Sequence, residues 1–122
     1  DAQESRGLGD VYKRQILKRA VYYVARDLSS QLSTITQTTD YSKLEKCYSI
    51  WICAEDVPKK LQNTLTEYSF SKKDIIGVAD EPEEDYDLLT VIIIRLGKEA
   101  EEKGIFDYLK GLWPHNILHV LI

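Results

Sequence analysis

The chain has 122 residues, of which 43% are hydrophobic and 30% charged, and its net charge is −4. These values describe one globular domain and exclude a multidomain enzyme, a disordered chain and a strongly basic nucleic-acid coat. No apolar run approaches the roughly 20 residues of a membrane-spanning helix, and residues 1–15 do not resemble a signal peptide. We therefore expect a cytoplasmic protein without membrane contact.

Residues 1–15, DAQESRGLGDVYKRQ, show neither helical nor strand periodicity and contain no initiator Met. The stretch 4–15 resembles the read-through of a sequencing-library adapter. We therefore predict that this segment is not native and leave it out of the fold. On this interpretation the native region before Ile16 is missing from the chain.

From Ile16 onward, apolar residues recur at spacings of three and four, which predicts an α-helix. Its expected apolar stripe consists of Leu17, Val21, Val24, Leu28, Leu32 and Ile35. A second face, polar and aromatic, carries Arg19, Tyr23, Arg26 and Ser30.

The following segments alternate between strand and loop patterns. Residues 47–54, CYSIWICA, are apolar on both alternating sets, which predicts a strand covered on both sides. Residues 63–72 alternate weakly, as in an edge strand, and the acidic stretch 79–87 is typical of a solvated loop. Residues 88–96 predict a second buried strand, and 99–112 return to helical spacing.

This order of helix, three strands and helix predicts an α/β fold with a mixed sheet flanked by helices. Buried strands such as 47–54 and 88–96 require a neighbour on each side. We therefore expect their remaining sheet partners to lie outside this chain. An exposed sheet edge would then favour self-association or prevent stable folding.

Four further patterns carry no assigned chemistry. Cys47 and Cys53 are too far apart along a strand for a disulfide, so we predict free thiols. His115 and His119 would share one face of a helix, but Asn116 replaces the Glu of the zinc-protease motif. The acidic run lacks the spacing of a calcium loop, and neither a phosphate-binding Gly loop nor a partnered nucleophile is present.

The start of the predicted helix is basic and aromatic. Lys18, Arg19, Tyr22, Tyr23 and Arg26 fall within nine residues. Such a group can bind a phosphate backbone through its cations, with the rings positioning it. The alternative is structural, with Arg19 and Tyr23 forming a pair that the rest of the fold covers.

Several blocks together resemble one known family. The RxxYY block at Arg19, Tyr22 and Tyr23 and the CYSIWIC block at 47–53 carry most of the resemblance, and the other blocks are ILKRAVYYVARDLSSQ, YSKL, TEYSFSKKDIIG and YDLLTVIIIRL. In order and spacing they are similar to the PD-(D/E)XK nuclease family transposases, also described as recombination-promoting nucleases.

That resemblance implies a partial restriction-endonuclease-like fold over 16–112. In the complete parent, an Asp on one strand and an acidic residue with Lys or Gln on the next would hold Mg²⁺ for DNA hydrolysis. Those strands precede the helix, so we assign no catalytic or metal-binding residue to this chain, and we expect no cofactor for the fragment itself. The resemblance makes Arg19, Tyr23 and Gln31 accessory candidates near metal or DNA.

Residues 113–122 depart from the pattern expected of that family, as a truncation or frame shift would. The competing hypothesis is a small non-enzymatic interaction module that binds a protein through the Arg19 and Tyr23 face. Salt-dependent DNA binding distinguishes the two hypotheses.

Overall fold

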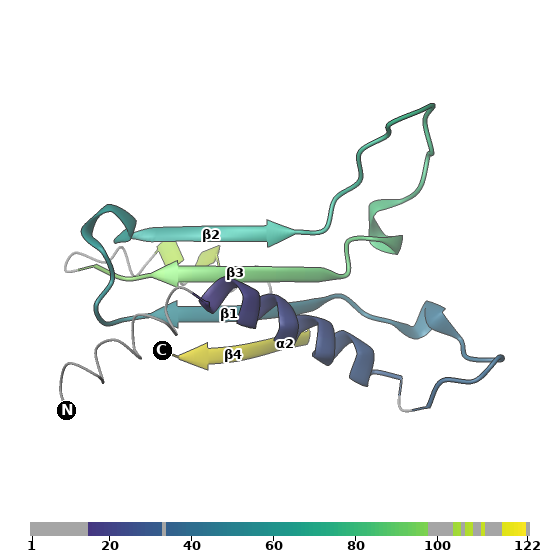
Figure 1. Cartoon of the computed structure of the whole chain (residues 1–122), viewed down its shortest axis with the longest axis horizontal. Helices are drawn as coiled ribbons and strands as arrows, with labels where there is room; N and C mark the ends of the chain where they lie inside the picture. Colours follow the sequence, from purple (N-terminus) through teal and green to yellow (C-terminus); the bar gives the residue numbers. More distant parts are fainter. Residues whose placement is uncertain are drawn as a thin grey trace.

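The computed structural model describes residues 15–32, 34–97, 104–105, 107–108, 111 and 116–121. Its main elements are α2 (Ile16–Ser30), β1 (Cys47–Cys53), β2 (Thr64–Ser69), β3 (Leu89–Arg95) and β4 (Asn116–Leu121) (Figure 1). Short 3₁₀ turns lie between them: η1 (Tyr41–Lys43), η2 (Lys59–Leu61) and η3 (Glu83–Asp85). Apart from Gln15, the segment predicted to be foreign lies outside the described residues.

The strands form one mixed sheet in the order β2-β3-β1-β4. β1 is parallel to β3 and to β4, whereas β2 is antiparallel to β3. The register places Trp51 between Ile93 of β3 and Val120 of β4. The predicted α/β fold with a mixed sheet is therefore confirmed, and β2 is an edge strand of the described sheet, as predicted.

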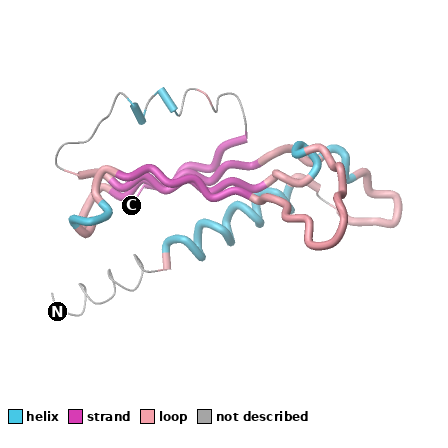
Figure 2. The backbone as a smooth tube through the Cα atoms, turned by 90° about the horizontal axis from the view of Figure 1, so that it is seen from above, coloured by secondary structure: helices cyan, strands magenta, loops and turns pink. Residues whose placement is uncertain are grey.

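Both faces of the two central strands are covered, as the apolar pattern of 47–54 and 88–96 predicted. α2 lies on one face, where Ile16, Ala20 and Val24 pack against β1 and β3 (Figure 2). The helical residues Ile105 and Tyr108 pack on the opposite face. The buried side chains alternate along β1 because successive residues of a strand point to opposite faces.

The buried stripe of α2 differs in part from the predicted one. Val21 is 47% exposed and Ile35 60% exposed, whereas Ala20 is completely buried. The stripe follows Ile16, Ala20 and Val24 at strict spacings of four. A helix that packs closely on a sheet favours a small residue at the point of contact. A search for large apolar residues overlooks such a position, because alanine is only weakly hydrophobic.

β4 settles one open question and corrects one expectation. Asn116–Leu121 forms a strand, so His119 does not lie on the helix that a shared site with His115 would need; His115 lies outside the described residues. β4 also pairs with the edge of β1 that was expected to lack a partner within this chain. The apolar segment satisfies the backbone groups that an open edge of β1 would leave unpaired.

The buried side chain of Ile93 gives a direct test of the packing between the sheet and α2. Ile93 of β3 is fully buried on the sheet face that α2 covers, so Ile93→Ala removes apolar contacts and leaves a cavity. We expect it to lower the free energy of unfolding by about 2–5 kcal/mol in urea denaturation. The matched control Ile76→Ala, at a site 96% exposed, should change it by less than about 0.5 kcal/mol. Equal effects at the two sites would contradict the described core.

Candidate basic and aromatic surface

Trp51 anchors the side-chain cluster that joins β1 to α2. It is 1% exposed, and its indole N–H donates a hydrogen bond to the hydroxyl of Ser49 at 2.6 Å. The ring centroid of Tyr23 lies 5.8 Å from that of Trp51, and the guanidinium carbon of Arg19 lies 5.8 Å from the Trp51 centroid. The Trp51 ring therefore contacts two side chains of α2 from the sheet side.

A second cation continues the cluster outward. The guanidinium carbon of Arg26 lies 4.9 Å from the Tyr23 ring centroid and 6.0 Å from that of Tyr22. The two tyrosine rings meet edge to face with centroids 5.7 Å apart. We call these five residues the cation–aromatic stack: Arg19, Tyr22, Tyr23, Arg26 and Trp51. Contacts of this kind contribute about 0.5–2 kcal/mol each.

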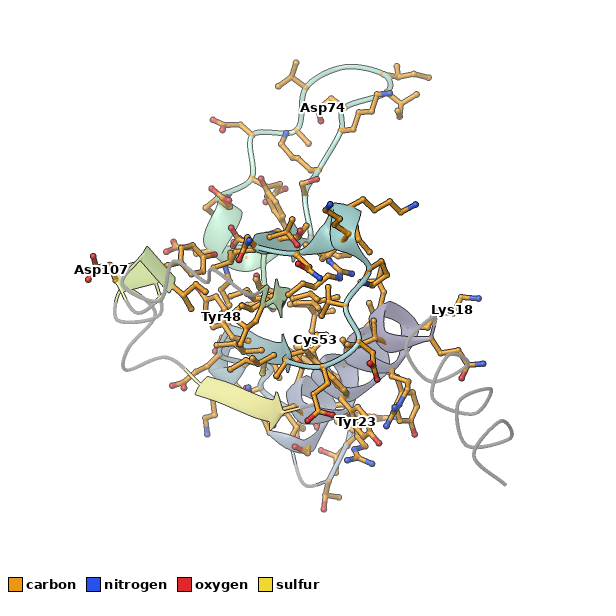
Figure 3. All side chains as sticks on the ribbon, turned by 90° about the vertical axis from the view of Figure 1, so that its left-hand side faces the viewer. Lys18, Tyr23, Tyr48, Cys53, Asp74 and Asp107 are labelled. Carbon is orange, nitrogen blue, oxygen red and sulfur yellow. The ribbon has the colours of Figure 1, made fainter. Side chains whose placement is uncertain are left out.

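Exposure divides the predicted site residues into two groups. Arg19 and Tyr23 are partly buried and lie against the Trp51 ring. Lys18, Tyr22 and Arg26 are exposed on the same helix, and Figure 3 shows Lys18 and Tyr23 on the α2 side of the sheet. The helix therefore presents two cations and a tyrosine ring to solvent, with one of the cations held over aromatic rings.

Gln31 lies just beyond α2 and has different contacts. Its side-chain amide donates to the Glu45 carbonyl at 2.9 Å and lies 2.9 Å from Cys47 Sγ, while its carbonyl oxygen accepts from the Glu45 N–H at 2.7 Å. These bonds tie the end of the helix to the start of β1. The structure thus does not bring Gln31 into the cation–aromatic stack, and its accessory role stays a prediction.

The sequence analysis missed an ion pair on the opposite face of the sheet. Lys46 donates to Asp87 at 2.9 Å and lies 5.0 Å from the Tyr48 ring centroid. Burial lowers the pKa of Lys46, but the hydrogen bond to Asp87 and the neighbouring Tyr48 together raise it more. The pKa of Lys46 therefore lies above its ordinary value, and the charged form is favoured.

The position of this pair follows from the pairing of the strands and not from a local sequence pattern. Lys46 directly precedes β1, and Asp87 lies two residues before β3. Because β1 and β3 are parallel, both strands begin at the same end of the sheet. The solvated-loop prediction for 79–87 holds for residues 79–85, which are exposed, but not for Asp87, whose side chain is 12% exposed.

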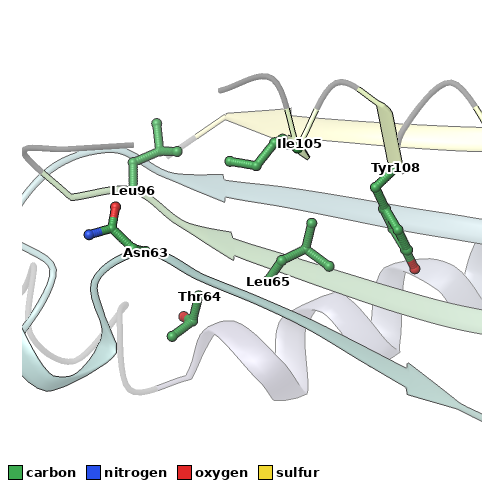
Figure 4. Close-up of a pocket in the computed structure, with 7 residues that line it drawn as sticks. Asn63, Thr64, Leu65, Leu96, Ile105 and Tyr108 are labelled. Carbon is green, nitrogen blue, oxygen red and sulfur yellow. The ribbon is translucent and has the colours of Figure 1, made fainter. Parts of the chain in front are cut away.

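A cavity of about 560 Å³ lies on the same face as this ion pair, beside β2 (Figure 4). Its walls include Asn63, Thr64, Leu65, Leu96, Ile105 and Tyr108. Burial, and then the nearby Glu67 carboxylate, raises the pKa of Tyr108. The cavity has no arrangement of side chains that identifies a ligand.

The family resemblance implies a metal, which several His, Cys, Asp or Glu side chains would hold. The described residues contain no group of three or more such side chains that could hold an ion. The described part of the chain therefore does not fit a metal centre. Cys47 and Cys53 form no disulfide, as predicted.

Comparison with family models, with curated proteins and with solved structures gave no match to this chain. The resemblance to the nuclease family thus stays a prediction. Within the described residues, every helix is too short or too polar to cross a lipid bilayer.

The raised pKa of Lys46 predicts a pH-dependent contribution to stability. A lysine with a raised folded pKa stabilises the protein fully below its unfolded pKa and loses this effect as pH rises through the folded pKa. We expect Lys46→Met to destabilise the chain at neutral pH, and the difference from wild type to shrink above about pH 10.5. Urea denaturation at neutral and alkaline pH measures it, with Lys59→Met, at an exposed site, as control. A difference that stays constant across this range would refute the proposed pairing.

Proposed function

We propose that this chain is part of a PD-(D/E)XK nuclease family transposase and that the exposed side of α2 lies against the DNA backbone. The observation that carries the proposal is the position of Arg26, which is exposed and lies over the Tyr23 ring at 4.9 Å. Lys18 supplies a second exposed cation on the same helix. Phosphate contacts are the dominant source of affinity for DNA.

The stacking of Arg26 on the Tyr23 ring favours phosphate binding for a physical reason. A guanidinium that lies over a ring still has N–H donors along its edge, and these donors match the oxygens of a phosphate. Tyr23 is itself held by Trp51, so Arg26 loses less side-chain freedom when it binds than an unsupported arginine would. Tyr22 lies exposed beside it and can contact the sugar or the phosphate.

The catalytic part of the proposal concerns the complete parent. By the resemblance, Mg²⁺ and its carboxylate ligands belong to strands before Ile16, and the metal would activate the water that hydrolyses DNA. β4 occupies the edge of β1 in this chain. The proposal therefore requires the upstream strands to displace β4 or to join the sheet beyond it. We also propose a cytoplasmic location.

The DNA-facing role of α2 predicts a change in salt dependence. We expect Arg26→Ala and Lys18→Ala to weaken duplex binding severalfold, each lowering the slope of log affinity against log salt by about 0.9. Fluorescence anisotropy over a series of salt concentrations measures both quantities. Lys59→Ala removes an equally exposed cation away from α2 and should leave the slope unchanged. If all three variants bind like wild type, the DNA contact lies elsewhere.

The catalytic proposal predicts a difference between two forms of the protein. Joined to its native upstream region, the chain should nick supercoiled plasmid in Mg²⁺, and EDTA should abolish the nicking. The 122-residue chain alone should leave the plasmid intact. Gel electrophoresis of the plasmid measures the outcome. Robust Mg²⁺-dependent cleavage by the 122-residue chain would show that we have misplaced the catalytic groups.

A further inference from the structure

The connection between β2 and β3 extends away from the sheet (Figure 1) and carries an apolar tip. Ile75, Ile76 and Val78 form this tip and are 78%, 96% and 85% exposed. Exposed apolar residues are common singly, but three within four positions at the end of a protruding loop make a patch. Such a patch gains free energy only when another surface covers it.

Hydrogen bonds at its base hold the tip in one arrangement. Lys72 donates to the Asp74 carboxylate at 2.8 Å and also to the Ala79 carbonyl. The Ala79 N–H donates to the other Asp74 oxygen at 3.2 Å. Gly77, with φ of +69°, allows the chain to reverse between these residues. The tip is therefore presented outward by an ordered turn and is pre-organised for docking.

The part of the loop that returns to β3 indicates what kind of surface can cover the apolar tip. Asp80, Glu81, Glu83, Glu84 and Asp85 are all exposed, and we call them the acidic segment. Negative charge at this density repels nucleic acid and anionic lipid. A surface that fits must therefore combine apolar contacts with positive charge.

The chain itself carries such a surface on α2. Val21 is 47% and Tyr22 63% exposed, and Lys18 and Arg26 lie exposed on the same helix. Figure 3 shows Asp74 at the top of the view, well apart from Lys18 and Tyr23, so the loop lies away from α2 of its own copy. The complementary surfaces can meet only between two molecules.

We propose that the apolar tip and acidic segment of one copy dock on the exposed side of α2 in a second copy. Ile75 and Ile76 would cover Val21 and Tyr22, while the acidic segment would face the cations of the helix. This contact uses the helix side that we propose for DNA. A competition between self-association and DNA binding would follow, and that consequence alone rests on the proposed function.

Sedimentation of the 122-residue chain without DNA tests the docking independently of any nuclease role. We expect the average mass to rise above 14.1 kDa with increasing concentration, and less so at high salt. The double variant Ile75→Ser/Ile76→Ser should weaken association about tenfold or more. Ile35→Ser, at an exposed apolar residue outside both surfaces, should associate like wild type. Circular dichroism melts check that each variant folds.

A charge exchange identifies the two surfaces. One variant, Glu83→Lys/Glu84→Lys, and a second, Lys18→Glu/Arg26→Glu, should each associate at least tenfold more weakly alone, because like charges then replace complementary pairs. An equimolar mixture should associate again, since each reversed surface meets its complement on the other chain. A wild-type chain that is monomeric at every concentration would overturn the proposal. So would association that survives both variants, or a mixture that stays monomeric.

Discussion

The described structure depends on the burial of Trp51 between β1 and α2. Its ring occupies the face of the sheet that Ile16, Ala20 and Val24 cover, and it also supports Tyr23 and Arg19 from below. One side chain thus fixes the packing of the helix and the direction of its outward residues. The contacts that stabilise the fold and those that shape the α2 surface are therefore physically coupled.

The chain has a net charge of −4 but carries two surfaces of opposite charge. Cations and aromatic rings gather along α2, whereas acidic residues gather on the connection between β2 and β3, together with an exposed apolar tip. The first surface suits phosphate and the second repels it. Their complementarity links the proposed DNA contact to the proposed self-association, because both need the exposed side of one helix.

Local periodicity predicted α2, β1, β2 and β3, because the pattern of each reflects which of its own side chains are buried. It missed β4, whose partner β1 is distant in sequence. It placed Val21 in the core because a small residue such as Ala20 adds little to an apolar pattern. The Lys46–Asp87 pair required the parallel register of β1 and β3, which no local pattern contains. The stacking of Arg26 on Tyr23 was foreseeable only as a shared helix face.

The most direct test of the α2 surface is a titration of the isotopically labelled chain with duplex DNA, followed by NMR. The side-chain N–H signals of Arg19 and Arg26 report on the cation–aromatic stack, and the backbone signals report on every other surface. At a concentration where the chain is monomeric, we expect shifts that concentrate on Lys18, Tyr22 and Arg26. Shifts confined to other parts of the chain, or no shift at all when DNA is in excess, would contradict this account.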